Sequence, residues 1–299
     1  MSRMQVQMLP DGRRLHLHDG PIDLVIGAEG ENVASAYASA TARFETILDE
    51  LCAELPLLRQ PTGPEPQGAV ARRMWRATIG FTKHAFITPM AAVAGAVAEE
   101  VLEAMLAEAR LTRAFVNNGG DIALHLAKGA SYRAGLVDRP DQPSLFASAD
   151  FSSADPVRGI ATSGWRGRSF SLGIADAVTV LAERASVADA VATLIANAVN
   201  LPGHPAITRV PAQHIQPDND LGARLVTRGV GPLPANEIAA ALDAGVAFAQ
   251  ELAAQGLVAA AALHLQGDTR VVGQGLGRLS TDAGRESEEI PRVGGRHPP

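Results

Sequence analysis

The first part of the chain consists of three short segments in which apolar and polar residues alternate. The apolar members of these segments are Val6, Met8, Leu15, Leu17, Ile22, Leu24 and Ile26. Side chains of a β-strand point alternately to its two faces, so this pattern predicts strands. The residues Pro10-Asp11-Gly12 between the first two segments are typical of a turn. We therefore predict an antiparallel meander at the start of the chain.

Helical spacing of apolar residues marks four later segments, which we predict to be helices: 31–55, 89–110, 187–199 and 235–254. Alanine is frequent in these segments, and its small side chain lets a helix pack closely against a neighbouring element. Pro56 is expected to end the first helix, because proline has no backbone N–H to donate. Residues 56–70 contain further prolines and are predicted to form a linker-like loop.

The middle of the chain has the pattern of successive short strands, separated by Gly, Asn, Asp and Pro. The predicted strands are 113–116, 121–127, 131–137, 157–163, 168–173 and 176–182. A last hairpin is expected from 257–265 and 269–272, whereas residues 201–233 hold five prolines and are expected to be mostly irregular. Strands that follow strands directly favour antiparallel pairing. The predicted fold class is α+β, with mostly antiparallel sheets packed against long, Ala-rich helices.

The domain organisation follows from where the apolar residues stop. Residues 276–299 are rich in Gly, Arg and Glu and have few apolar side chains, so they are predicted to form a disordered tail. Residues 1–275 are predicted to form a single domain, and the 46% of hydrophobic residues in the chain is enough for a substantial core.

Charge and cysteine content exclude several kinds of partner. The formal net charge is −6, which gives no electrostatic reason to bind nucleic acid. The single cysteine, Cys52, rules out an intramolecular disulfide and fits a reducing compartment. A signal peptide and a long apolar run are both missing, so we expect a cytoplasmic protein with no membrane partner.

Three places carry residues suited to binding chemistry, and the first is a glycine pair after a predicted strand. Asn118, Gly119, Gly120 and Asp121 follow one another there. Glycines expose backbone N–H groups and let a ligand approach the main chain. The same residues are also typical of an ordinary hairpin turn, so both interpretations stay open.

The second place is the end of the predicted strand 157–163. Thr162, Ser163 and Gly164 are followed by Trp165 and by two arginines, Arg166 and Arg168. Hydroxyls and backbone amides can bind a phosphate, an arginine can neutralise it, and a tryptophan can stack on a planar ring. The alternative is a solvated hairpin in which the arginines serve solubility.

The third place is the start of a predicted helix. Asp189 and Thr193 stand four residues apart, so they share one helix face. A carboxylate and a hydroxyl supply the hard oxygen ligands that magnesium prefers. Alternatively, Ser186 and Asp189 have the spacing of a capping box. The histidines lack metal-ligand spacing, and the chain contains no P-loop, Rossmann or serine-hydrolase motif.

Taken together and in this order, the three places resemble motifs of the ApbE-like superfamily, whose characterised members are FAD:protein FMN transferases. The family's Gly-Gly-Asn loop resembles Gly119-Gly120-Asp121. Its Ser-Thr-Ser-Gly strand end resembles 161–164, its Ala-Asp-Ala-Leu-Ala-Thr helix start resembles 188–193, and its Gly-Ile-Ala-Lys-Gly-Tyr helix is similar to 92–97. The resemblance implies a fold related to the T-fold and a flavin nucleotide, FAD or FMN, as ligand.

Carried over by position, the resemblance assigns roles to individual residues. Asp189, Thr193 and the main-chain carbonyl of Ala94 would be magnesium ligands, while Gly119, Gly120 and residues 162–164 would line the flavin nucleotide. Two features depart from the family's pattern. Its lysine falls on Gly95, and its His-Ile-x-Asp-Pro-x-Thr-Gly segment is replaced by residues 169–174.

The segments Pro89-Met90-Ala91-Ala92 and Asn219-Asp220-Leu221-Gly222 look most like a cytoplasmic branch of the superfamily for which resemblance implies no reaction. Three functions follow as alternatives. The chain would be a magnesium-dependent FMN transferase with an altered active site and a protein acceptor, a magnesium-dependent FAD pyrophosphate hydrolase, or a flavin-nucleotide-binding protein without catalysis. Loss of the family's lysine and histidine favours binding or an altered reaction.

Overall fold

The computed structural model describes residues 4–137, 145–273 and 276–278. Within these residues, nine strands form one large sheet in which every neighbouring pair is antiparallel. In order across the sheet, these strands are β1 (Gln5–Met8), β2 (Leu15–Asp19), β3 (Ile22–Glu31), β4 (Arg110–Asn118), β5 (Asp121–Leu126), β8 (Gly159–Ser163), β9 (Ala177–Ala182), β12 (Ala260–Leu265) and β13 (Asp268–Gly273).

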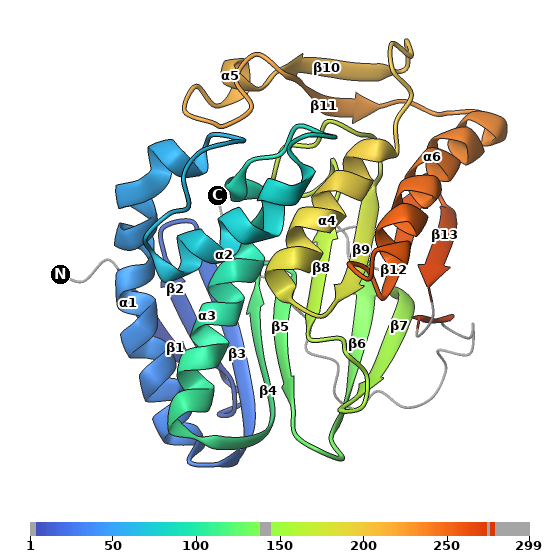
Figure 1. Ribbon diagram of the computed structural model, residues 1–299. Coiled ribbons are helices and arrows are strands. Elements are labelled where there is room, and N and C mark those ends of the chain that lie inside the picture. The colour runs from blue at the N-terminus through green and yellow to red at the C-terminus, as the bar shows by residue number, and fades with distance from the viewer. Residues whose placement is uncertain (1–3, 138–144, 274–275, 279–299) are drawn as a thin grey trace.

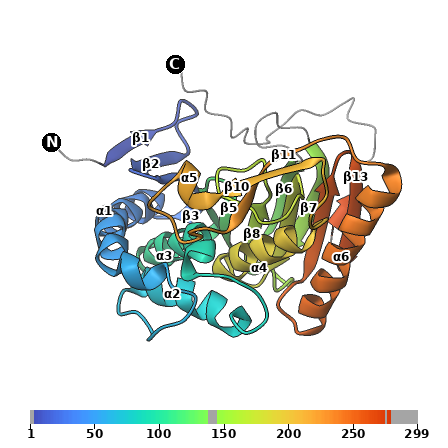
Figure 2. The same ribbon diagram turned by 90° about the horizontal axis from the view of Figure 1, so that it is seen from above.

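Helices cover one face of this sheet, as Figures 1 and 2 show. They are α1 (Val33–Leu58), α2 (Ala69–Thr78), α3 (Val93–Glu108), α4 (Ala185–Ala198) and α6 (Ala235–Ala254). Two short 3₁₀ turns, η1 (Ile79–Phe81) and η2 (Pro89–Ala92), connect α2 to α3. A smaller sheet of β6 (Ser131–Val137), β7 (Leu145–Ser152) and β14 (Leu276–Arg278) packs on the opposite face. The predicted α+β class with mostly antiparallel sheets is confirmed.

The core divides according to these layers. Phe44 of α1 and Met105 of α3 pack with Leu24 of β3 in one cluster. A second cluster joins α4 and α6 to β9 and β12, and a third fills the space between the large sheet and β6–β7. The two helical clusters meet where α3 packs against α4, and this meeting point places the candidate site described below.

Close packing of α3 on α4 depends on Gly95. A Cβ atom at this position would lie 2.2 Å from the carbonyl oxygen of Ala185, at the start of α4. No such contact is tolerated without movement of the backbone, so only glycine fits here. The side chain of the family's lysine therefore has no room at Gly95 in this chain.

Several sequence predictions are corrected by the structure. Pro56 does not end the first helix, because α1 continues to Leu58, a buried residue whose packing stabilises the last turn. The predicted loop 56–70 is accordingly shorter, since α1 ends at Leu58 and α2 begins at Ala69. The amphipathic helix α2 was not predicted. Its buried residues include Val70 and Met74.

Two further segments differ from the prediction. Residues 168–173 do not form a strand, because Leu172 N–H donates to the side-chain oxygen of Asn197 and the backbone of Gly173 lies against the end of α4. Residues 201–233 are more ordered than predicted and contain a hairpin of β10 (Ile207–Pro211) and β11 (Leu225–Val230) and a short helix α5 (Ala212–Ile215).

The predicted tail begins with β14, so its first three residues belong to a strand, while residues 279–299 lie outside the described residues. The prediction of a single domain over residues 1–275 remains a prediction. None of the helices in the described part of the chain combines the length and hydrophobicity that crossing a membrane requires.

Candidate functional site

The structure brings two aspartates from different motifs together. Asp121 is the first residue of β5, directly after the glycine pair, and Asp189 lies near the start of α4. Asp121 Oδ1 accepts a hydrogen bond from Thr162 N at 3.2 Å, and Asp189 Oδ2 accepts one from Gly95 N at 3.0 Å. The two carboxylates are near enough for the charge of one to act on the other. Four elements, α3, β5, β8 and α4, therefore meet at this pair.

Desolvation disfavours the ionised form of both carboxylates. It raises the pKa of Asp121 from 3.8 to about 7, against the lowering effects of the Thr162 N–H and of the Arg168 charge. The pKa of Asp189 is also raised well above its ordinary value, first by burial and then by the neighbouring Asp121 carboxylate. Backbone N–H groups of Gly95 and Ala94 act in the opposite direction. The pair is therefore a place where a positive charge or a proton is favoured.

Asp189 does not cap its own helix. The N-cap of α4 is Arg184, and no side chain caps this end of the helix. Ser186 lies inside the helix, and both its N–H and its hydroxyl donate hydrogen bonds to Glu99 Oε1 at 2.8 Å. The capping-box interpretation is therefore wrong. The Asp189 carboxylate instead accepts hydrogen bonds from the backbone N–H groups of Gly95 and Ala94 in the first turn of α3, where the helix dipole favours an anion.

Hydroxyl groups line one side of the pair. Thr193 lies one turn after Asp189 on α4, and its Oγ1 donates to Ser163 Oγ at 3.5 Å. The Thr162 hydroxyl forms a hydrogen bond with the Thr179 hydroxyl at 2.9 Å. Thr162 therefore contacts the carboxylate pair through its backbone N–H, which donates to Asp121. The predicted pairing of Asp189 with Thr193 on one helix face thus extends to Ser163 of β8.

Asn118 and Ala94 close another side. The buried Asn118 side chain donates from Nδ2 to the Ala94 carbonyl oxygen at 3.2 Å. A metal ion at this oxygen would have to share it with that donor. The role of the Ala94 carbonyl as a ligand stays a prediction.

The glycine pair makes a turn and also faces an arginine. Gly119 and Gly120 have φ values of +67° and +117°, and Gly120 N donates to Asn117 Oδ1 at 2.8 Å. A Cβ at Gly119 would lie 2.0 Å from Nη2 of Arg168. The turn and ligand-loop interpretations are therefore compatible, because Arg168 lies directly over the turn and beside Asp121.

Arg166 has a different environment from Arg168. Its Nε donates to Asp176 Oδ1 at 2.6 Å, and its guanidinium lies 4.4 Å from the ring centre of Trp165. Trp165 Nε1 donates to the same oxygen at 3.0 Å, and Gln266 N donates to the other at 2.7 Å. Asp176, which the sequence analysis did not single out, thus fixes Trp165 and Arg166. A phosphate-binding role stays a prediction for both arginines, and the geometry favours the exposed Arg168.

The oxygen atoms of this site match the preferences of magnesium. Among the described residues, no group of three or more His, Cys, Asp or Glu side chains could hold a metal ion. Two carboxylates and a hydroxyl nevertheless suffice for magnesium, which commonly binds one or two protein carboxylates and completes its shell with water and substrate phosphates. The residues present therefore fit this ion, provided that a phosphate ligand contributes.

Comparison with known proteins identifies the family. A family model described as AbpE bacteria matches residues 6–271. The chain belongs to this family. The predicted membership of the ApbE-like family is thereby confirmed.

The chain is also similar to proteins of archaea. It is 38% identical over 180 residues to a UPF0280 protein of Methanopyrus kandleri, covering 58% of this chain and 69% of that protein. It is 36% identical over 149 residues to one of Methanosarcina barkeri, covering 46% and 52%, and 38% identical over 135 residues to one of Archaeoglobus fulgidus, covering 44% and 51%. The matched part thus spans about half the length of the latter two proteins.

A solved structure is also similar. The crystal structure of Pseudomonas stutzeri flavinyl transferase ApbE, apo form, matches with a TM-score of 0.43 and 11% identity, covering 90% of this chain and 93% of that chain. Similarity at this level says nothing of what the present chain binds.

Proposed function

We propose that this family member binds the pyrophosphate of a flavin nucleotide at Asp121, Asp189 and Thr193, together with magnesium. The observation that carries the proposal is the convergence of two half-buried carboxylates, from β5 and α4, beside a hydroxyl on the same face of α4 as Asp189. Two like charges in one partly buried site are unfavourable unless a cation or a proton lies between them.

The surrounding groups suit a phosphate. The exposed Arg168 lies over the glycine turn, where its guanidinium can pair with a phosphate oxygen bidentately. Ser163 can contribute a hydroxyl beside Thr193. The positive guanidinium of Arg168 thus faces the anionic oxygens of a nucleotide phosphate. The two carboxylates, together with those phosphate oxygens, would bind the divalent ion.

FMN transfer is the first candidate reaction. The bond between the FMN phosphorus and the bridging oxygen breaks, AMP leaves, and a hydroxyl oxygen of a protein acceptor forms the new bond to phosphorus while losing its proton. Magnesium, when bound, would offset negative charge on the pyrophosphate and on the leaving AMP. Of the chain's own residues, Asp121 and Asp189 would hold the ion, and Arg168 would pair with a phosphate directly. With water in place of the acceptor hydroxyl, the same geometry supports hydrolysis of FAD.

A second candidate is binding without catalysis, and one observation favours it. Residues 169–174 replace the family's segment with a histidine and an aspartate, and in this chain they form hydrogen bonds within the protein. Ser171 O accepts from Thr227 N at 2.9 Å, and the Ser171 hydroxyl accepts from Gly173 N at 3.2 Å. This segment therefore offers no free imidazole or carboxylate to take the proton of an attacking hydroxyl.

Binding and catalysis are separated by one experiment. FAD is titrated into the protein with magnesium and with EDTA, and the mixture is then analysed for AMP, free FMN and protein-bound FMN. We expect magnesium-dependent FAD binding that Asp189→Asn abolishes and that Asp243→Asn, an exposed aspartate of α6, leaves intact. AMP with protein-bound FMN indicates transfer, AMP with free FMN indicates hydrolysis, and neither indicates binding alone. FAD affinity that is equal with magnesium and with EDTA would contradict the proposal.

A further inference from the structure

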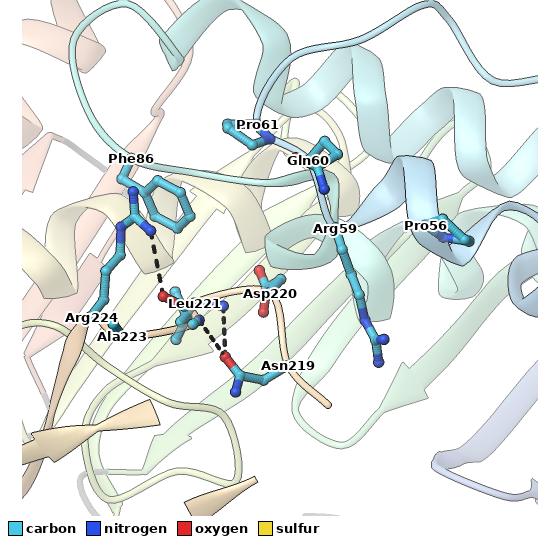
Figure 3. A pocket seen from close by; sticks show the side chains of 11 residues that line it. Pro56, Arg59, Gln60, Pro61, Phe86, Asn219, Asp220, Leu221, Ala223 and Arg224 are labelled. Atoms are coloured by element: carbon cyan, nitrogen blue, oxygen red, sulfur yellow. Dashed lines mark hydrogen bonds between the residues drawn. The ribbon is translucent and has the colours of Figure 1, made fainter. Parts of the chain in front are cut away.

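A separate cleft of about 530 Å³ lies between the end of α1 and the loop before β11, and Figure 3 shows the residues that line it. Its walls come from three segments far apart in sequence: Arg59 and Gln60 after α1, Phe86 ahead of η2, and residues 219–224. None of the residues of the carboxylate pair lines it. The volume lies within the range of small-molecule sites.

Hydrogen bonds fix the loop that forms one wall. Asn219 Oδ1 accepts from Leu221 N at 2.7 Å and from Gly222 N at 2.8 Å, as the dashed lines in Figure 3 show. Gly222 has a φ of +59°, which favours glycine in this turn. The ion pair of Arg59 with Asp218 ties the same loop to the end of α1. The cleft is therefore formed in advance of any ligand.

Arg224 is the group best placed to bind an anion. This exposed side chain has its guanidinium carbon 3.3 Å from the ring centre of Phe86, so the ring covers one face of the guanidinium. One nitrogen, Nη1, donates weakly to Leu221 O at 3.4 Å. In the described part of the chain no carboxylate forms an ion pair with Arg224, whereas Arg59 is paired with Asp218. The in-plane N–H groups of a guanidinium suit a carboxylate or phosphate.

Asp220 supplies the complementary group. Its Oδ2 accepts a hydrogen bond from the hydroxyl of the buried Thr88 at 2.5 Å, which positions the carboxylate in the lining of the cleft; Figure 3 shows it between Arg224 and Arg59 in that view. Its other oxygen can accept a hydrogen bond from a ligand. The cleft thus combines an anion-binding guanidinium with an acceptor for a neighbouring hydroxyl or amino group.

We propose that this cleft is a second ligand site, which binds a small oxyanion, a carboxylate or a phosphate, that also carries a hydroxyl or amino group. Arg224 binds the oxyanion and Asp220 accepts a hydrogen bond from the adjacent donor. The site works independently of the carboxylate pair, so its existence does not rest on the function proposed above.

Calorimetric titration of the full chain in EDTA tests the site. The probes are malate and succinate, which differ by one hydroxyl, and glycerol 3-phosphate, which separates a phosphate from a carboxylate ligand. We expect malate or glycerol 3-phosphate to bind, and malate to bind more tightly than succinate. Arg224→Gln should weaken binding at least about tenfold, because it removes a charge-assisted pair. Asp220→Asn should reduce the preference for malate over succinate.

Two controls make the result decisive. Arg228→Gln removes an exposed arginine of the same strand region, outside the cleft, and should leave binding unchanged. Asp189→Asn should leave it unchanged as well, which keeps this result separate from that of the carboxylate pair. The proposal is overturned if none of the probes binds, if Arg224→Gln binds like the parent, if Arg228→Gln weakens binding equally, or if Asp189→Asn abolishes it.

Discussion

Replacing Asp121 by Asn should make the ligand-free protein more stable at alkaline pH. The folded state raises the pKa of this carboxyl from 3.8 to about 7, so ionising it in the folded protein is unfavourable. Its contribution to stability is fully present below the unfolded pKa and is lost as pH rises through the folded pKa. Asparagine keeps an oxygen to accept from Thr162 N and carries no charge to bury.

The magnitude follows from the same shift. At about 1.36 kcal/mol per pKa unit, the full penalty above pH 7 is about 4 kcal/mol. Asp121 retains some contact with solvent, so we expect about half of this, or about 2 kcal/mol, which corresponds to about 4 °C in the melting temperature.

Thermal unfolding in EDTA, followed between about pH 5 and pH 8, measures the effect. The gain of Asp121→Asn over the parent should grow as pH rises to about 7 and then level off. The control Asp243→Asn alters an exposed helical aspartate and should show no such trend. An Asp121→Asn gain that is independent of pH, or a loss of stability at pH 8, would refute the conclusion that burial disfavours the ionised form of Asp121.

The two arginines after β8 should have different roles. Arg168→Gln should weaken nucleotide binding at least about tenfold, measured by titration, and should change the melting temperature little. Arg166→Gln should instead destabilise the protein by about 1–3 kcal/mol in chemical denaturation, because it leaves the buried Asp176 without its cation, and equal effects of the two substitutions would contradict this distinction. Gly95→Ala should destabilise by about 1–3 kcal/mol, since its Cβ would lie 2.2 Å from the Ala185 carbonyl oxygen; an unchanged denaturation midpoint would show that α3 and α4 separate easily.

Much of the fold was predictable because its long elements have strong periodicity. The helix predicted at 235–254 matches α6 at both ends, and the meander of β1–β3 follows the alternation of its apolar residues. The errors lie where tertiary packing overrides local propensity. Pro56 stays inside α1 because Leu58 is buried, and residues 168–173 are held as a loop by Asn197 rather than paired as a strand.

The candidate site was predictable in its parts and not in its assembly. Sequence placed Asp189 and Thr193 on one helix face, and the structure retains that arrangement. Spacing within one helix, however, carries no information about Asp121, which joins the pair only because β5 and α4 meet in the fold. Asp176 was missed for the same reason, since no local pattern shows that Trp165, Arg166 and Gln266 converge on its carboxylate.

Anomalous diffraction from Mn²⁺, a magnesium substitute, in crystals grown with FAD tests the central claim most directly. The account predicts one strong anomalous peak within about 2.0–2.4 Å of carboxylate oxygens of both Asp121 and Asp189, with the FAD pyrophosphate completing the shell and Thr193 beside it. A peak elsewhere on the chain, or FAD bound with no metal between the two carboxylates, would contradict the account.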